Sequence, residues 1–258
     1  MQKALFIILF SFSFSVFAQS NLPYKLGEVS KFTISFGLID VGSADLEIVE
    51  TKKIGNKQTF HIVGKGKTSP FFDWFFKVRD IYETYIDTSS LLPVKFLRDI
   101  NEGGYKINQK YRFFHNDSIV ETQDSVFKIP PNAQDMLSAL FYARTFNKKD
   151  LKRSNSFFVP IFMDNENYFL EILYLHNEIL DTKWGKVNCM VFKPKMQEGR
   201  IFESGEQMKI WIADDFNHLL MQVETKIWAG TIKAVLIDYK SLKTPFTIIQ
   251  GTKKEVKL

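Results

Sequence analysis

Acidic side chains gather in one short part of the chain and are the clearest candidates for acid–base chemistry. Asp214 and Asp215 are adjacent, and Glu203 and Glu206 closely precede them. Two carboxylates can act as general acid and general base when their surroundings separate their pKa values. However, adjacent residues of a strand or turn point in opposite directions, and an Asp beside Asn217 is typical of a hairpin capped by side-chain to backbone hydrogen bonds. The sequence favours this structural role for the Asp pair.

Other catalytic and metal-binding patterns are missing from the sequence. No two of the four histidines, His61, His115, His176 and His218, have the i, i+4 spacing of a metal-binding helix. The chain has neither a G-x-S-x-G motif for a serine nucleophile nor a P-loop for phosphate groups. We therefore assign no catalytic residue, no metal site and no cofactor.

An aromatic run between Ser69 and Arg79 is the most unusual local feature. Five aromatic residues lie within six positions, so their rings cannot all point to one side of a strand. The run either packs in the core, plugs the open end of a barrel, or exposes rings that contact a membrane, an acyl chain or a sugar. Tryptophans elsewhere in the chain could line the same apolar interior. Our candidate ligand-binding residues are Phe71, Phe72, Trp74, Phe75, Trp211 and Trp228.

Period-two patterns predict that most of the chain forms strands. Phe32, Ile34 and Phe36 alternate with polar residues, and Gly42 marks a turn before a second alternating segment at 43–50. Further strands are predicted at 59–64, 80–87, 94–100, 105–115, 118–122, 157–163, 168–178, 186–193, 207–213, 219–227 and 231–241.

A single segment breaks this pattern and predicts a helix over about residues 132–146. Its apolar residues Ala133, Met136 and Leu137 begin an i, i+3, i+4 pattern that continues in the next turn. Asn132 is a possible N-cap, and Asp135 falls in the first turn, where the helix dipole favours an acid.

The segments on either side of this helix resemble each other. Gly104 follows Tyr85 at the same spacing as Gly230 follows Trp211, and the turns upstream correspond at an offset of about 126–130 residues. We predict a mainly β fold in which tandem antiparallel units form a curved sheet or open half barrel, with one helix between the halves. The predicted divisions are a signal peptide (1–18), a first β half (19–130), the helix and linker (131–150), a second β half (151–245) and a basic tail (246–258).

Composition excludes several classes of protein. With 258 residues, of which 45% are hydrophobic and 24% charged, the chain is neither disordered nor collagen-like, and one cysteine excludes a disulfide scaffold. Cys189, in an apolar stretch, is predicted to be a small buried residue. The formal net charge of +5 is modest, and no long basic face alternates with stacking aromatics. Nucleic acid is therefore not an expected partner.

The first residues have the pattern of a secretory signal. Lys3 precedes an apolar run that ends at Phe17, and Val16 and Ala18 occupy the −3 and −1 positions of a cleavage site before Gln19. The run is shorter than the roughly 20 residues needed to span a bilayer. We expect a periplasmic or secreted protein without a transmembrane segment; an uncleaved membrane anchor is the alternative. No cysteine stands directly after the cleavage site, so a lipoprotein is not expected.

Several short strings, in their order along the chain, resemble the domain of unknown function 3108 family. They are Leu26-Gly27-Glu28, Val78-Arg79-Asp80, the turn from Asp87 to Pro93, Arg98 with Glu102-Gly103-Gly104-Tyr105, the segment from Asp135 to Arg144, and the segment from Trp211 to Asp215. The resemblance covers about residues 25–243, although Leu219-Leu220 stands where the family favours a proline. It implies an exported or envelope-associated β-rich bacterial protein without established activity, and it supplies no catalytic residues.

Two functional hypotheses follow from these features. The first is a non-enzymatic envelope protein that binds an apolar ligand, such as a lipid or acyl chain, or an envelope partner. The second is a hydrolase that acts on a cell-envelope polymer through the carboxylates described above. The sequence does not separate the first from a purely structural assembly factor. An internal apolar cavity would favour the first hypothesis, and carboxylates that converge in a polar cleft would favour the second.

Overall fold

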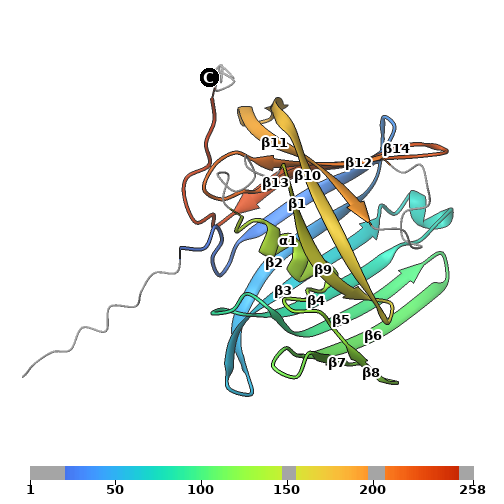
Figure 1. Ribbon diagram of the computed structural model, residues 1–258. Coiled ribbons are helices and arrows are strands. Elements are labelled where there is room, and N and C mark those ends of the chain that lie inside the picture. The colour runs from blue at the N-terminus through green and yellow to red at the C-terminus, as the bar shows by residue number, and fades with distance from the viewer. Residues whose placement is uncertain (1–20, 147–154, 197–206, 250–258) are drawn as a thin grey trace, which may run out of the picture.

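Antiparallel strands dominate the residues that the structure describes, 21–146, 155–196 and 207–249. In this computed structural model, fourteen strands of the described chain form one sheet, in the order β8-β7-β6-β5-β4-β3-β2-β1-β14-β13-β12-β11-β10-β9 (Figure 1). The strands are β1 (Val29–Phe36), β2 (Ile39–Ile54), β3 (Lys57–Thr68), β4 (Arg79–Asp87), β5 (Pro93–Glu102), β6 (Tyr105–Phe114), β7 (Ile119–Glu121), β8 (Val126–Lys128), β9 (Ser156–Met163), β10 (Glu166–Thr182), β11 (Gly185–Met196), β12 (Gln207–Ala213), β13 (Leu220–Ile227) and β14 (Gly230–Lys240).

The sheet is built from two meanders joined through β1. Strands β2 to β6 follow one another in space as they do in sequence, and so do β10 to β14. Each meander begins with two long strands, and β1 pairs with β2 on one side and β14 on the other. The predicted tandem of antiparallel units, which form one curved sheet, is therefore confirmed.

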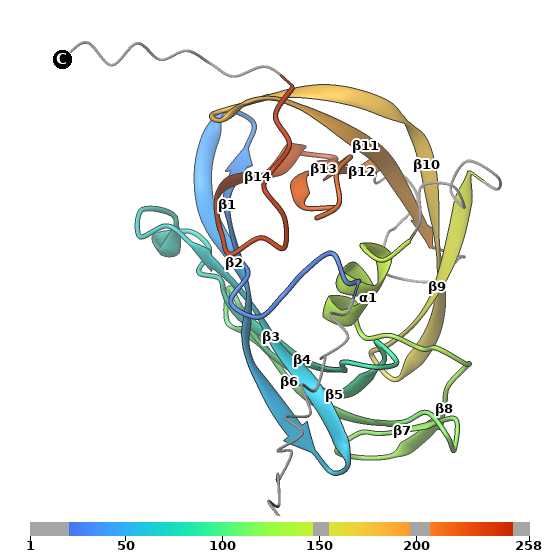
Figure 2. The ribbon, with the colours of Figure 1, turned by 90° about the vertical axis from the view of Figure 1, so that its left-hand side faces the viewer.

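The sheet curls around an interior without closing into a barrel (Figure 2). Its edge strand β9 approaches the segment before α1 and the first meander through single contacts instead of a ladder. The Gln134 backbone donates to Pro160 O (2.8 Å) and accepts from Phe162 N (2.9 Å). Arg98 of β5 donates to Asp164 in the turn between β9 and β10, at 2.8 Å. These contacts provide partners for some of the backbone N–H and C=O groups at the exposed edge of the sheet.

Helix α1 (Met136–Ala143) lies inside the curve of the sheet (Figure 2). Asp135 is its N-cap, since the carboxylate accepts hydrogen bonds from Leu137 N and Ser138 N, and the Ser138 side chain completes a capping box. The predicted helix began too early. Asn132 has a φ of 61°, and Gln134 is paired with β9, so neither residue is helical.

Three hydrophobic clusters fill the interior. The first lies between one face of α1 and strands β2 to β6, with Ile48, Ile62 and Phe96 fully buried. The second lies between the opposite face of α1 and strands β9 to β12. The third joins β1 and β14 to alternate residues of β11 and β12, including the buried Cys189. Each face of the helix thus packs against one meander.

Most predicted strands are present, and each tends to be longer than its alternating segment. Strand β8 was not predicted. The described residues contain no helix that is long and apolar enough to cross a bilayer. The predicted signal peptide, residues 147–150 of the linker and residues 250–258 of the tail lie outside the described residues, and the division into domains stays a prediction.

Candidate functional site

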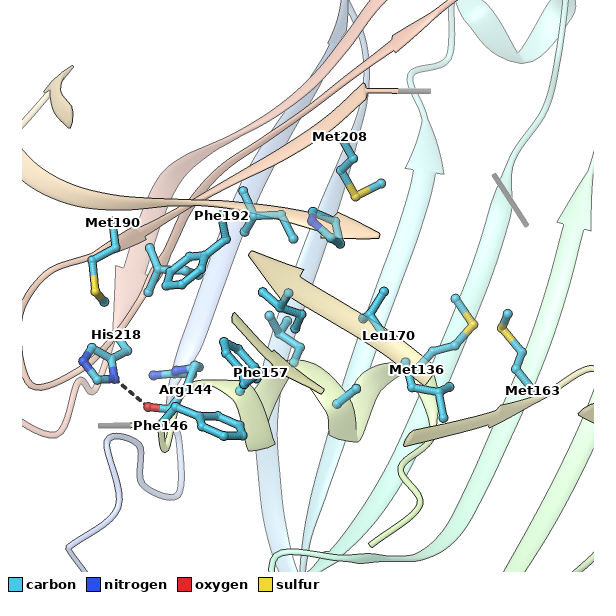
Figure 3. A pocket seen from close by; sticks show the side chains of 18 residues that line it. Met136, Arg144, Phe146, Phe157, Met163, Leu170, Met190, Phe192, Met208 and His218 are labelled. Atoms are coloured by element: carbon cyan, nitrogen blue, oxygen red, sulfur yellow. Dashed lines mark hydrogen bonds between the residues drawn. The ribbon is translucent and has the colours of Figure 1, made fainter. Parts of the chain in front are cut away.

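A cavity of about 290 Å³ lies between helix α1 and strands β9 to β12. Strand alternation explains how β12 lines it: Ile210 and Ile212 face the cavity, whereas Trp211 between them lies in the third hydrophobic cluster. The lining is almost wholly apolar. It consists of Met136, Ala139, Leu140, Ala143, Arg144, Phe146, Phe157, Ile161, Met163, Leu170, Ile172, Met190, Phe192, Pro194, Met208, Ile210, Ile212 and His218 (Figure 3).

Methionines form one end of the cavity. Met136 of α1 and Met163 of β9 lie side by side at this end, Met208 of β12 lies apart from them on the wall away from His218, and Met190 lies near His218 (Figure 3). Unbranched thioether side chains adapt their shape readily, so this part of the wall can fit apolar groups of different shape.

The opposite end carries the polar groups, Arg144 and His218 (Figure 3). The Arg144 guanidinium is already occupied: it forms a bidentate ion pair with Glu28 (2.6 and 3.2 Å) and donates to Asn217 O at 2.8 Å. It also packs against the rings of Tyr24 and Phe141. Arg144 therefore joins the end of α1 to the N-terminal segment and is not free to bind a ligand.

His218 is the polar side chain that remains at this end. Its Nδ1 donates to Arg144 O at 2.6 Å, which fixes the ring orientation. Among the described residues, none forms a hydrogen bond with its Nε2. A neutral imidazole that donates through Nδ1 presents Nε2 as an acceptor, and a protonated one presents a second donor.

The six candidate ligand-binding residues do not line this cavity. Phe71, Trp74 and Phe75 are exposed and Phe72 is half-buried, all in the connection between β3 and β4 that contains the 3-10 helix η1 (Phe72–Trp74). Trp228 is fully exposed in the β13–β14 turn, and Trp211 is buried in the third cluster. The structure thus brings four of them together in one connection, and their role in binding stays a prediction.

The carboxylates at the β12–β13 connection are used in hydrogen bonds. Asp215 accepts from Asn217 N (3.0 Å) and Thr247 N (3.1 Å), which confirms that it caps the connection. The Asp214 side chain points toward β10 and β11, where it accepts from Asn177 (2.7 Å) and Asn188 (3.0 Å). Glu203 and Glu206 lie outside the described residues.

The histidines are distributed over the molecule. His61 is bound to Glu83 at 2.7 Å and stacks on Tyr85, and burial lowers the pKa of His115. In the described ranges no group of three His, Cys, Asp or Glu residues could hold a metal ion.

Asp135 was expected at the helix start, but the burial of its carboxyl was not predicted from the sequence. Asp135 is fully buried, and Thr84 of β4 donates to it at 2.6 Å. Burial raises its pKa to about 6, although hydrogen bonds from Thr84, Ser138 and Leu137 act in the opposite direction. Its position in a capping box was the available signal, whereas its burial depends on β4, which is distant in sequence.

The chain is similar in sequence to one family and in fold to a solved structure. The model of the family described as Protein of unknown function (DUF3108) matches residues 31–237. Nothing matches among curated proteins. A beta-barrel-like protein of domain of unknown function DUF1849 from Brucella abortus aligns with a TM-score of 0.56 and 7% identity, over 85% of this chain and 99% of that chain. This similarity concerns the fold alone.

Two further solved structures align at lower TM-scores. One is a Bacteroides fragilis NCTC 9343 protein described as exported and as having a YmcC-like fold, with a TM-score of 0.36, 10% identity, and coverage of 85% of this chain and 98% of that chain. The other is described as a lipoprotein from Parabacteroides distasonis ATCC 8503, with a TM-score of 0.35, 11% identity and the same coverage.

Proposed function

This chain belongs to the DUF3108 family, and from the apolar cavity inside its curved sheet we propose that it is an exported cell-envelope protein that binds an apolar ligand, such as one acyl chain. The observation that carries this proposal is the apolar cavity between α1 and β9 to β12. Ligand sites in proteins are mostly apolar cavities with a few polar groups that fix orientation. The secretory pattern of residues 1–18 supports export to the periplasm or the exterior.

The cavity suits a single hydrocarbon chain. Its volume of about 290 Å³ is close to the lower limit of roughly 300 Å³ for small-molecule sites. Its walls offer aliphatic, thioether and aromatic groups, so a chain would be held by burial of apolar surface. The adaptable methionine end allows chains of different length or shape.

The polar end suggests how the ligand would be oriented. Since Glu28 already neutralises Arg144, His218 Nε2 is the group left to bind a carboxyl, hydroxyl or ester oxygen. The ligand head would then lie near His218 and its chain would extend toward Met208. This orientation accounts for the chemistry of both ends of the cavity.

Titration with a fluorescent long-chain fatty acid tests this proposal, together with native mass spectrometry of the purified protein and separate identification of the lipids extracted from it. We expect one ligand per chain. The variant Ala143→Phe fills the cavity from α1 and should weaken binding at least about tenfold. Ile179→Phe, which places the same side chain at an exposed position of β10, should bind like the unmodified protein.

The result depends on folded variants, so near-ultraviolet circular dichroism accompanies each titration. If Ala143→Phe does not fold, Met208→Ser at the other end of the cavity replaces it, because it removes apolar contact without adding bulk. Equal affinity of a folded cavity variant and of Ile179→Phe would contradict binding in the cavity.

A further inference from the structure

Four connections meet at one end of the sheet. Phe36 lies opposite both Ile39 and Ile232, which places the β1–β2 turn beside the start of β14. The β3–β4 connection and the β5–β6 turn join the same end through the bridge between Val78 and Glu102. Figure 1 shows these connections and the β13–β14 turn together at its right-hand side.

The most exposed apolar side chains of the described residues all lie on these connections. The six largest exposed fractions among the large hydrophobic residues belong to this end of the molecule, whereas exposed apolar residues elsewhere are less accessible. They are Leu38 (103%), Trp228 (99%), Trp74 (84%), Phe71 (72%), Phe75 (66%) and Tyr105 (65%). We call this set the aromatic rim. An apolar cluster of this kind marks a surface that contacts another molecule or a membrane.

The rim is held in place by specific contacts. Arg79 donates to both oxygens of Asp73 (2.9 and 2.5 Å), and Thr68 donates to the same carboxylate at 2.6 Å. The Arg79 guanidinium lowers the pKa of Asp73 to about 2, so this brace persists in mildly acidic conditions. The ring of Phe76 covers Gly103, where a Cβ would collide with it. The aromatic connection is therefore anchored while its neighbouring rings face outward.

Basic residues surround the rim. Lys67, Lys77, Lys106 and Lys226 are exposed beside it, and none of them forms an ion pair with a described residue. The acids at this end are less available: Asp73 is paired with Arg79, Asp80 is buried, Glu102 is half-buried, and of these four Asp40 alone is exposed. Exposed aromatic rings combined with lysines match the interface of an anionic bilayer, in which rings enter the headgroup region and lysines contact lipid phosphates.

We propose that the aromatic rim docks the protein on the surface of an anionic lipid bilayer, with Trp74 and Trp228 as the principal anchors. Tryptophan is enriched at this depth of membranes because its ring is apolar and its N–H is polar. A symmetric contact between two copies would instead bring like-charged lysines together, which is unfavourable. Docking does not require a ligand in the cavity, and the two proposals are tested by different variants.

The geometry also relates the rim to the cavity. Met208 lies opposite Thr225, and Gln207 lies opposite Lys226 immediately before the β13–β14 turn. The wall of the cavity that carries Met208 therefore lies toward the end of the sheet that carries the rim. Docking would bring this wall toward the source of acyl chains.

Sedimentation with lipid vesicles tests the docking. We expect the protein to bind vesicles made from equal amounts of phosphatidylcholine and phosphatidylglycerol, and to bind phosphatidylcholine alone more weakly. Binding should fall as salt is added, since the charge attraction is screened. Tryptophan emission should shift to the blue, and brominated lipids should quench it. Failure to bind the anionic vesicles at low salt would overturn the proposal.

Paired variants locate the contact. Trp74→Ser combined with Trp228→Ser should weaken vesicle binding at least about tenfold, and Lys77→Glu or Lys226→Glu should each weaken it about fivefold. The matched controls Phe216→Ser and Ile179→Ser change exposed apolar residues at the opposite end of the sheet and should have no effect. Equal binding by the rim and control variants would overturn the proposal. The proposal would also be overturned if the Trp variants bind vesicles as well as the unmodified protein but no longer self-associate in the absence of lipid, because the rim would then be a contact between copies.

Discussion

Arg144 and Glu28 form a bidentate ion pair whose side chains are only 5% and 3% exposed. Glu28 lies directly before β1, and Arg144 is the C-cap of α1, so the pair connects the start of the sheet to the end of the internal helix. The guanidinium also donates to Asn217 O, which adds the β12–β13 connection to the same network. This one arginine therefore holds three distant segments around the polar end of the cavity.

Removal of one partner should destabilise the fold strongly. In Arg144→Met the Glu28 carboxylate would remain buried without a counterion, and we expect the free energy of unfolding to fall by about 3–5 kcal/mol. Glu28→Gln should have a smaller effect, because its amide oxygen can still accept from the guanidinium. Urea unfolding measures both values. The double variant should lose less than the sum of the single variants, and strict additivity would contradict coupling of the pair.

The buried acid at the start of α1 should make stability depend on pH. Burial raises the pKa of Asp135 to about 6, so the folded state binds a proton more tightly than the unfolded state does. The stabilisation is complete below about pH 4 and is lost as pH rises through about 6. The free energy of unfolding should therefore be lower above pH 6 than below pH 4 by an amount on the order of 2–3 kcal/mol.

Asp135→Asn should remove this dependence while keeping the N-cap, because an Asn side chain also accepts from Leu137 N and Ser138 N. Urea unfolding between pH 4 and pH 8 would show the difference from the unmodified protein. Asp40→Asn, at an exposed position of β2, is the control. If Asp135→Asn and the unmodified protein lose stability equally over this range, the assigned protonation of Asp135 is wrong.

Local patterns predicted the strands well because alternation is set by the two faces of a sheet. They located α1 less accurately, since the helix start depends on the pairing of Gln134 with β9, a contact distant in sequence. The Asn132 position illustrates the difference. Its residue type suits an N-cap, yet its backbone has a left-handed φ of 61° that leads the chain into the bridge with β9.

The cavity was harder to predict than the fold. Alternation shows that Ile210 and Trp211 face opposite sides of β12, but only the packing of α1 decides which side encloses the cavity. Trp211 was chosen for its residue type, and it lies in a filled cluster. Similarly, the sequence identified the unusual aromatic run near Phe71 without showing whether its rings were covered.

The single cysteine should be unreactive in the folded protein. Cys189 is buried, as predicted, and burial together with the charges of Glu178, Asp215 and Asp214 raises the pKa of its thiol to about 12. At pH 8 the native thiol should react with a disulfide reagent about a thousandfold more slowly than an unfolded one. The exposed variant Ser89→Cys provides a second thiol that should react at the ordinary rate. Rapid labelling of Cys189 without unfolding would contradict this prediction.

His218 should determine which head groups the cavity accepts. Its Nδ1 is fixed by the Arg144 carbonyl, so Nε2 is the atom that can contact a ligand oxygen. His218→Phe retains an aromatic ring but removes this polar atom, and we expect the affinity for a fatty acid to fall about tenfold, which corresponds to the loss of one hydrogen bond. An alkane of the same length should bind both proteins equally.

The comparison of these two ligands separates head-group recognition from damage to the cavity. His218 also has a φ of 44°, which is uncommon for a residue with a side chain, so the substitution is made at a strained position and the thermal midpoint is measured as well. His218→Asn tolerates this φ and offers an amide in place of the ring, so it should recover part of the fatty-acid affinity. If both variants lose affinity for the fatty acid and for the alkane to the same extent, His218 shapes the cavity without contacting the head group.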